Sequence, residues 1–275
     1  MINTSIILST YNWIGALDIV LDSLYLQLID YPNVELIIAD DGSDDRTRKL
    51  IDTYKAKIVN LRHVWHEDNG FQKSKILNKA VAQSVGEYLI FLDGDCITFP
   101  DYIKYNLLMK ERGYFVAGNR VLLAKDFSDD IINKRYDYKN IFNWGIFSWL
   151  IAYYKKKVNK FLVDLRFKNV FWRYLRNSNW KYPKGCNFAV FRDDFINVNG
   201  FDESFTGWGH EDSDLFIRLL HNGLKVKDAR FAVPVLHLWH NSFNRDRQQS
   251  NYGIMMTRLA DVNFIKSIDG IDKYI

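Results

Sequence analysis

The chain has 275 residues, of which 48% are hydrophobic, 16% aromatic and 25% charged, and its formal net charge is +4. These proportions exclude an intrinsically disordered chain, and the length suffices for one large α/β domain or one domain with an insertion. No run reaches eighteen apolar residues, and the N-terminus enters a strand-like segment without a basic leader, so we expect a cytoplasmic protein. Cys96 and Cys186 are too few and too far apart in sequence to suggest a disulfide framework or a zinc site.

The first part of the chain alternates between strand-like and helix-like segments. Short apolar runs that end in polar residues predict strands, and apolar residues recurring at a spacing of three or four predict helices. The strands are predicted at 4–9, 34–39, 60–66 and 87–92, and the helices at 14–29, 45–55 and 72–84. Four strands that alternate with three helices predict an α/β fold with a mostly parallel central sheet, flanked by helices and joined by right-handed crossovers.

A polar cluster follows each of these predicted strands. The clusters are Thr10-Tyr11-Asn12, Asp40-Asp41-Gly42-Ser43, Asp68-Asn69-Gly70 and Asp93-Gly94-Asp95. Ligands of open α/β sheets bind beyond the carboxyl ends of the strands, so we expect the clusters to line one rim. The carboxylates of Asp93 and Asp95 suit Mg2+ or Mn2+, because hard cations prefer carboxylate oxygens. Taken alone, Asp93-Gly94-Asp95 is more typical of an Asp-Gly turn after a strand.

The order and spacing of these clusters resemble the nucleotide-sugar-binding half of family 2 glycosyltransferases, which have the GT-A fold. Asn69-Gly70-Phe71 and the stretch from Lys75 to Asn78 add to the resemblance, which covers the N-terminal third of the chain. It implies a UDP-sugar in the rim, with Asp40 on the uracil or ribose and with Asp93 and Asp95 on ribose and metal. The nucleotide-binding residues that it implies are Thr10, Tyr11, Asn12, Asp40, Asp41, Lys75, Asp93 and Gly94.

The alternation stops after a predicted helix at 100–112 and a predicted strand at 114–119. Residues 121–181 hold thirteen Lys or Arg against five Asp, and aromatic rings alternate with these cations over 142–176, including Arg166, Phe167 and Lys168. This composition suits the headgroup region of an anionic membrane, or single-stranded nucleic acid, although no nucleic-acid motif accompanies it. The simpler alternative is a helical insertion whose rings pack on the core. We predict an aromatic and basic helical insertion, with membrane contact left open and no nucleic-acid partner.

A second acidic cluster lies in Gly207-Trp208-Gly209-His210-Glu211-Asp212-Ser213-Asp214. The glycines allow a tight loop that presents the indole, and apolar residues after the acids predict a helix with acids in its first turn. Helix dipoles alone also favour acids there. The motif resembles the acceptor-side signature of β-1,4-galactosyltransferases and of chondroitin-polymerase-like bacterial relatives. The resemblance implies Asp212 as general base, Glu211 on an acceptor hydroxyl, and Trp208 with Gly207 at the acceptor sugar.

A late strand is predicted at 233–238, and it runs into His237-Leu238-Trp239-His240. Two histidines three residues apart are usually ordinary surface residues. In the related enzymes a residue after the last core strand completes the metal shell, so the resemblance implies a metal site of Asp95, His237, His240 and Asp93. Arg245 and Arg247 are assigned to the diphosphate. A helix is predicted at 252–260, and 261–275 carries no signal.

The sequence predicts one GT-A domain in four segments, which are a nucleotide-sugar-binding half at 1–120, the insertion at 121–181, an acceptor-binding and catalytic half at 182–249, and a helical tail at 250–275. The expected function is an inverting glycosyltransferase, dependent on Mn2+ or Mg2+. It would move a hexose or N-acetylhexosamine from a UDP-sugar to a saccharide or glycolipid acceptor in bacterial lipopolysaccharide-core or capsule synthesis. It would act in the cytoplasm, with peripheral contact to the inner membrane face left open.

Two alternatives stay open at this point. One is a catalytically silent carbohydrate-binding or scaffold protein that has kept the fold, and the intact pair of acidic clusters argues against it. The other is a sugar-nucleotide nucleotidyltransferase. Such enzymes usually carry a Gly-rich phosphate loop near the N-terminus, and residues 9–15 contain no such run.

Overall fold

The structure is a computed structural model, and it describes residues 1–163, 171–241 and 245–275. The strands are β1 (Thr4–Thr10), β2 (Val34–Asp40), β3 (Leu61–Trp65), β4 (Tyr88–Asp93), β5 (Cys96–Thr98), β6 (Tyr114–Ala117), β7 (Asn119–Leu122), β8 (Asn187–Phe191), β9 (Lys225–Asp228) and β10 (Pro234–His237). The α-helices are α1 (Ile14–Leu28), α2 (Asp45–Lys55), α3 (Lys73–Ala82), α4 (Tyr102–Met109), α5 (Lys125–Ile132), α6 (Ile146–Tyr154), α7 (Arg192–Asn197), α8 (Glu211–His221) and α9 (Gln248–Ala260). Short 3-10 helices are η1 (Tyr138–Asn143), η2 (Phe171–Tyr174) and η3 (Ile271–Tyr274).

The main sheet is mostly parallel, as predicted. Among the described residues it has seven strands in the order β3-β2-β1-β4-β8-β6-β9. The strands β3, β2, β1 and β4 run parallel, and Thr4 is in register with Val34 on one side and Tyr88 on the other. Strand β8 runs antiparallel to both β4 and β6. The carboxyl ends of β1 to β4 therefore meet at one edge, where the polar clusters lie.

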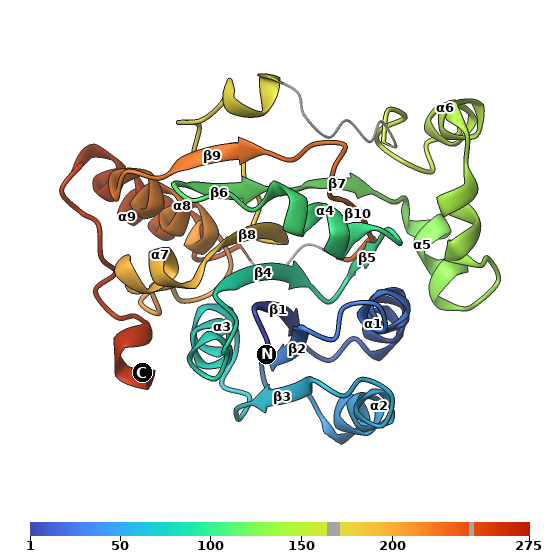
Figure 1. Cartoon of the computed structure of the whole chain (residues 1–275), viewed down its shortest axis with the longest axis horizontal. Coiled ribbons are helices and arrows are strands. Elements are labelled where there is room, and N and C mark those ends of the chain that lie inside the picture. The colour runs from blue at the N-terminus through green and yellow to red at the C-terminus, as the bar shows by residue number, and fades with distance from the viewer. Residues whose placement is uncertain (164–170, 242–244) are drawn as a thin grey trace.

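Both faces of this sheet are covered, which explains why its central strands are apolar throughout. In β1, Ile6 and Leu8 face a core cluster that includes Leu17 of α1, whereas Ile7 faces the opposite cluster with Ile76 of α3. Figure 1 shows α1 and α2 on one side of the strands and α3, α7 and α8 on the other. The sheet is thus the middle layer of three.

A small second sheet was not predicted. In the described part of the chain it has three strands in the order β5-β10-β7. The strand expected at 114–119 is divided, because β6 stays in the main sheet while β7 pairs with β10. The side chain of Asn187 lies at the division, where its Nδ2 donates to the carbonyl oxygens of Asn119 and Val233 at 3.1 and 2.8 Å.

The second sheet positions the acidic turn after β4. Strand β5 pairs antiparallel with β10, so that Cys96 lies opposite His237. The pairing continues past the strand, where the backbone N–H of Leu238 donates to the Asp95 carbonyl oxygen at 2.9 Å. Residues 142 positions apart in the sequence, Asp95 and His237, are therefore neighbours in the fold.

The segment 121–181 has both buried and exposed apolar side chains. Ile141 and Trp149 are buried in a core cluster. Phe147 and Tyr154, both on α6, are 78% and 88% exposed. Arg166, Phe167 and Lys168, which belong to the predicted aromatic and basic run, lie outside the described residues. In Figure 1, α6 lies at the opposite end of the molecule from α9.

The C-terminal region completes the same body. Helix α9 begins at Gln248, four residues before the predicted start, and η3 packs its buried Ile271 into the core cluster that contains α3. The described residues contain no helix that is both long and apolar enough to span a bilayer. Strands β8 and β9 of segment 182–249 share the main sheet with the first segment, so the four segments describe the sequence rather than separate bodies.

Candidate active site

The loops after β1, β2 and β3 are tied together into one rim, as the polar clusters predict. The Tyr11 hydroxyl donates to Asp68 Oδ2 at 2.8 Å. The backbone N–H of Asn12 donates to Ser43 Oγ at 2.8 Å, and the N–H of Asp44 donates to Asn12 Oδ1 at 2.9 Å. Thr10 is buried beneath these contacts, whereas Tyr11 is 48% exposed. Tyr11 and the backbone of the loop after β1 are therefore accessible to a ligand.

The two acids after β2 both have partners inside the protein. Asp40 accepts from the Ser43 N–H at 2.8 Å and lies 2.9 Å from His63 Nε2. Asp41 lies 2.7 Å from His66 Nε2 and accepts from the backbone N–H of Gln72 at 3.0 Å. Burial raises the pKa of Asp41, although His66 opposes this. A nucleotide that contacts either carboxylate has to share or replace one of these partners, so both nucleotide-binding roles stay predictions.

A lysine that sequence reasoning missed lies beside Asp93. Lys73 Nζ is 2.6 Å from Asp93 Oδ1, which also accepts from the Ser9 hydroxyl at 2.8 Å. Burial alone would raise the pKa of Asp93, but the Lys73 ammonium outweighs burial and lowers it. The lysine predicted near the nucleotide was Lys75, which lies two positions further along α3 and about 200° around its axis. The role of Lys75 stays a prediction, and Lys73 is the lysine that reaches the acidic turn.

A cavity of about 250 Å³ joins this turn to the second acidic cluster. Its charged or polar lining side chains include Lys73, Asp93, Arg120, Lys184, Cys186, His210, Glu211, Asp212 and Gln248, and Trp208 also lines it. Burial would lower the pKa of the Lys73 amine, but the carboxylates of Asp93 and Glu211 together raise it. One ammonium therefore balances acids from two sequence segments that were predicted to serve donor and acceptor.

The acids of the second cluster are held by a tight loop. Gly207 and Gly209 have φ angles of +70° and +118°, in the left-handed region that glycine tolerates. Helix α8 begins at Glu211, whose Oε2 accepts from the Gly209 N–H at 3.1 Å. Asp212 Oδ2 accepts from the backbone N–H of Gly185 at 2.9 Å. A Cβ at Gly185 would lie 2.8 Å from Asp212 Cβ, so this approach requires glycine.

Glu211 and Asp212 have different environments although they are adjacent. Glu211 is 8% exposed. Burial, with the nearby charge of Asp212, raises the pKa of Glu211 to about 7, and Lys73 opposes the shift. Asp212 accepts from the backbone N–H of Ser213 at 2.7 Å in addition to Gly185, so both of its oxygens are oriented by the backbone. Two carboxyl groups with different environments are the usual arrangement for divided acid-base roles.

Trp208 and the two arginines after the last strand lie on the same side of this loop. The guanidinium carbon of Arg245 lies 5.5 Å from the centroid of the half-buried Trp208 ring. The Cβ and Cγ atoms of Arg247 pass close to Gly207. An indole that carries a cation on one face can still stack a sugar on the other. The contacts of Trp208 and Gly207 with an acceptor, and of Arg245 and Arg247 with a diphosphate, stay predictions.

Asp95, His237 and His240 form the predicted ligand cluster. One ligand atom from each residue lies within 4.8 Å of the others. His237 Nε2 is 3.7 Å from Asp95 Oδ1, and His240 Nε2 is 3.5 Å from Asp95 Oδ2. The Nδ1 atoms lie 2.9 and 2.7 Å from the carbonyl oxygens of Leu238 and Asn241. A carbonyl only accepts, so each Nδ1 carries the proton and each Nε2 has a lone pair for a metal.

This donor set fits a divalent metal. Two neutral imidazoles and one carboxylate suit a transition-metal ion such as Mn2+ better than Mg2+, which prefers oxygen ligands. Asp93, also predicted as a ligand, is instead bonded to Ser9 and Lys73. Its assignment to the ribose therefore fits its surroundings better than its assignment to the metal.

Two protein-family profiles match the chain. The profile of glycosyl transferase family 2 matches residues 5–188, which is about two thirds of the chain. The chain belongs to glycosyl transferase family 2. The profile of a galactosyltransferase domain matches residues 166–241, which include the Gly-Trp-Gly-His-Glu-Asp motif. The predicted resemblance of this family 2 member to both groups is confirmed.

Curated relatives resemble the family 2 member over most of its length. It is 26% identical over 236 residues to validoxylamine A glucosyltransferase of Streptomyces hygroscopicus subsp. jinggangensis, covering 82% of this chain and 53% of the relative. It is 28% identical over 238 residues to chondroitin synthase of Escherichia coli, covering 83% and 34%. The chain thus spans about half or less of the length of these relatives.

Solved structures share the fold of this family 2 member. A structure of Staphylococcus aureus TarS in complex with UDP superposes with a TM-score of 0.63 at 18% identity, over 99% of this chain and 68% of that chain. The Pyrobaculum calidifontis mannosyltransferase PcManGT, in complex with GDP-Man and Mn2+, superposes with a TM-score of 0.57 at 16% identity, over 94% and 61%. These neighbours confirm the predicted GT-A fold.

The third acid of the motif, Asp214, forms buried ion pairs in this family 2 member. Asp214 is fully buried, and its two oxygens lie 2.8 Å from Arg218 Nε and 2.9 Å from Arg258 Nη1. Arg258 lies on α9 and also contacts Asp202 at 2.9 Å. Asp214 therefore links α8, the helix that carries Glu211 and Asp212, to α9.

Replacing Asp214 by Asn is expected to lower the free energy of unfolding by roughly 3–5 kcal/mol, because it leaves buried arginine charge unpaired. Urea unfolding followed by circular dichroism measures the change. The matched control is Asp126→Asn, an exposed first-turn acid of α5, which should stay within about 0.5 kcal/mol of the parent. Equal stability of the two variants would remove Asp214 from the structural framework.

Replacing Glu211 by Gln is expected to stabilise the protein at alkaline pH. The folded-state pKa of Glu211 is about 7 against an ordinary value of 4.5, so its stabilising contribution is complete below pH 4.5 and is lost as pH rises through 7. Gln stays neutral, so its advantage should be absent near pH 4.5 and reach at most about 3 kcal/mol at pH 8. Denaturation at both pH values tests this, with the exposed Glu67→Gln as control. A pH-independent difference would contradict the raised pKa.

Proposed function

We propose that this family 2 member is an inverting glycosyltransferase, dependent on a divalent cation, that transfers a hexose or N-acetylhexosamine from a UDP-sugar to a saccharide acceptor. The observation that carries the proposal is the shared cavity, in which Lys73 and Asp93 of the nucleotide-binding half face Trp208, Glu211 and Asp212. Donor and acceptor groups would meet between these residues. The bacterial surface polysaccharide pathway is proposed from the same motifs.

In the proposed reaction the acceptor hydroxyl loses its proton to Asp212. The hydroxyl oxygen forms a bond to the anomeric carbon of the sugar while the bond from that carbon to the UDP oxygen breaks, and the bonding electrons leave with UDP. Attack opposite the leaving group inverts the anomeric configuration. The backbone N–H groups of Gly185 and Ser213 hold the Asp212 carboxylate in place for this transfer.

Other residues bind and orient in this proposal. Glu211 would accept a hydrogen bond from a second acceptor hydroxyl, and Trp208 would stack on the acceptor ring. Asp93 would hold the ribose, with its orientation fixed by Ser9 and Lys73. A divalent cation, when bound by Asp95, His237 and His240, would supply positive charge for the diphosphate leaving group.

The related enzymes support the donor class. TarS has been solved with UDP and with UDP-GlcNAc, and two curated relatives are named as a glucosyltransferase and a chondroitin synthase. PcManGT was solved with GDP-Man, so the fold accepts both nucleotides. The experiment is therefore a screen that measures UDP release from UDP-glucose, UDP-galactose, UDP-N-acetylglucosamine and UDP-N-acetylgalactosamine with Mn2+.

In that screen the parent protein should release UDP from at least one donor faster than the Asp212→Asn variant does. Hydrolysis serves as the readout where no acceptor is supplied. Release at the variant's rate for all four donors would favour the silent binding protein. Conversion of a donor to UTP and a sugar 1-phosphate when pyrophosphate is added would favour the nucleotidyltransferase.

We also propose that α6 contacts an anionic membrane surface. Phe147, Ile151 and Tyr154 on this helix are 78%, 56% and 88% exposed, and the exposed Lys155, Lys156 and Lys157 follow directly. Exposed rings beside cations fit the headgroup level of an anionic bilayer, where rings insert shallowly and lysines meet lipid charge. This contact would bring the enzyme to a glycolipid acceptor at the inner membrane face.

The double change Phe147→Ser and Tyr154→Ser is expected to lower the fraction of protein that sediments with vesicles containing phosphatidylglycerol at low salt. Added salt should also release the parent protein, because Debye screening weakens the lysine contribution. Ile268→Ser, at a residue 75% exposed in the C-terminal tail, is the matched control. Failure of the parent protein to sediment at low salt would contradict the membrane proposal and leave the transfer proposal untouched.

A further inference from the structure

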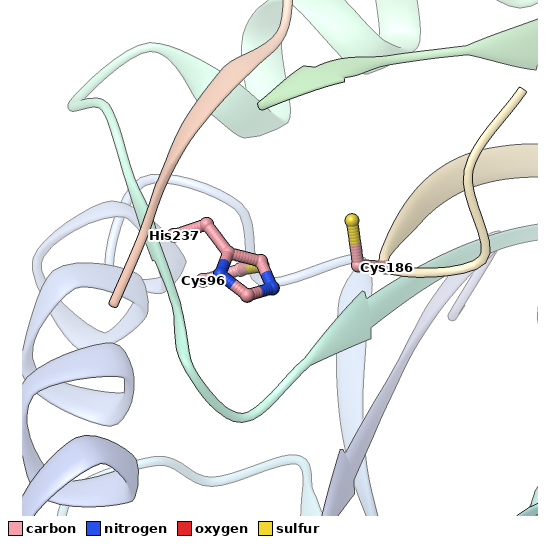
Figure 2. A group of neighbouring side chains, drawn as sticks. All are labelled: Cys96, Cys186 and His237. Atoms are coloured by element: carbon pink, nitrogen blue, oxygen red, sulfur yellow. The ribbon is translucent and has the colours of Figure 1, made fainter. Parts of the chain in front are cut away.

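We propose that Cys96, Cys186 and His237 form a second cation site, selective for a thiophilic divalent cation such as Zn2+ or Cd2+. One ligand atom from each of the three residues lies within 4.8 Å of the others, and all three residues are buried. Figure 2 shows His237 in front of Cys96, with Cys186 beside them. The proposal does not depend on the transfer reaction, since it concerns cation binding by the resting protein.

Two strand pairings bring these residues together from distant parts of the chain. Cys96 is the register partner of His237 in the antiparallel pair of β5 and β10. Cys186 precedes β8, and its carbonyl oxygen accepts from the backbone N–H of Asp93 at 3.2 Å, which extends the pairing of β4 and β8. The separation of the two cysteines in sequence argued against a zinc site, and only the sheet order shows that they meet.

The geometry and the charge balance suit a soft cation. Zinc binds thiolate sulfur at about 2.3 Å and imidazole nitrogen at about 2.0–2.1 Å, so ligand atoms around one ion lie roughly 3.5–4 Å apart. The ligand atoms of Cys96, Cys186 and His237 lie within 4.8 Å of one another, so small side-chain rotations would bring them to the separation that zinc requires. Two thiolates neutralise a dication, so the occupied site carries no net charge in a buried place. On binding, the two thiol protons leave to solvent.

A metal site also needs a residue that contacts one of the ligands from outside, here called an outer partner, and a path by which the cation enters. The surroundings of the two cysteines provide both. Arg120 Nη1 lies 3.8 Å from Cys186 Sγ, so the half-buried guanidinium is the outer partner of this ligand. Cys186 and Arg120 both line the cavity that contains Glu211 and Asp212. A cation can therefore reach the sulfur from the cavity.

His237 belongs to both clusters and cannot serve both at once. Its Nδ1 donates to the Leu238 carbonyl oxygen, which leaves the single lone pair of Nε2 for a metal. The same Nε2 lies 3.7 Å from Asp95 Oδ1. A soft cation held by the two sulfurs would withdraw His237 from Asp95 and His240. Hard and soft cations are thus expected to exclude each other.

The test is a titration of the reduced protein with Cd2+, followed by the ultraviolet sulfur-to-cadmium charge-transfer band. The chain contains two cysteines, so a thiolate band can arise only from Cys96 and Cys186. The parent protein should develop the band with one equivalent of Cd2+. The variants Cys96→Ser and Cys186→Ser, checked for folding by circular dichroism, should bind at least tenfold more weakly with a smaller band.

His240→Ala is the matched control, because it removes a ligand of the Asp95 cluster alone. It should keep the charge-transfer band while weakening Mn2+ binding, whereas His237→Ala should weaken both. This comparison separates the failure of the soft site from the failure of the proposed metal dependence. Absence of a stoichiometric band in the folded parent protein would overturn the proposal.

A second measurement needs no variant. X-ray absorption at the zinc edge of the protein loaded with one equivalent of Zn2+ should show two sulfur neighbours at about 2.3 Å and a nitrogen neighbour at about 2.0 Å. Only nitrogen and oxygen neighbours would place Zn2+ at Asp95, His237 and His240 instead, and would also overturn the proposal.

Discussion

Replacing Asp212 by Asn is expected to lower turnover about 100- to 10,000-fold, the range that a positioned general base contributes. The change keeps size and removes the proton-accepting charge. The N–H groups of Gly185 and Ser213 bond to different oxygens of Asp212, so Asn can accept only one of them and the loop around the start of α8 loses one hydrogen bond. The affinity for UDP should stay within a few-fold of the parent, because the role proposed for Asp212 is at the acceptor.

Turnover from UDP-release kinetics and the dissociation constant of UDP from calorimetry separate these two effects. Asp193→Asn is the control, because Asp193 is also a first-turn acid, of α7, and lies on the surface. Glu211→Gln should be milder and should act mainly through the Michaelis constant of the acceptor, as expected for a residue that binds a hydroxyl. Turnover of Asp212→Asn within threefold of the parent would remove Asp212 from the mechanism.

The parallel half of the fold was predictable because its signals are local. The strands β1, β2 and β4 are buried on both faces, so each appears as a mainly apolar run that ends in polar residues, which are acids after β2 and β4. Helix α2 matches its predicted bounds at both ends, and Asp44 caps its start by accepting the N–H of Arg46. Such signals need no knowledge of distant contacts.

The parts that failed depend on distant contacts. Strand β5 has three residues, Cys96 to Thr98, and exists because β10 returns beside it from far along the chain. The predicted strand at 114–119 is divided at Gly118, where the side chain of Asn187 packs so closely that a Cβ would lie 2.3 Å from its Nδ2. The glycine is visible in the sequence, but the contact with Asn187 is not.

The candidate site divides in the same way. The motifs identify Asp93, Asp95, Glu211 and Asp212 as acids that follow strand ends or begin a helix. Helix periodicity cannot distinguish Lys73 from Lys75 until the position of Asp93 relative to α3 is known. In the sequence, Asp214 cannot be distinguished from the other first-turn acids, Glu211 and Asp212. Only its buried ion pairs with Arg218 and Arg258 show its structural role.

Replacing Asp95 by Ala is expected to abolish the part of UDP binding that depends on Mn2+. Asp95 supplies the only carboxylate of the described cluster with His237 and His240. Loss of an outer partner of a metal ligand already costs about 10- to 100-fold in metal affinity, so loss of the carboxylate itself should cost about 100-fold or more. Without that charge, two neutral imidazoles hold a hard cation poorly.

Calorimetry of UDP binding in Mn2+ and in EDTA isolates this contribution. The parent protein should bind UDP more tightly in Mn2+ than in EDTA, and Asp95→Ala should bind equally in both, at the parent's EDTA value. Asp126→Ala, an exposed acid on α5, should retain the full gain from Mn2+. If Asp95→Ala keeps that gain, the cation lies elsewhere. The affinity for UDP that remains in EDTA measures the metal-independent part of donor binding. We expect the rim, Lys73 and Asp93 to supply that part.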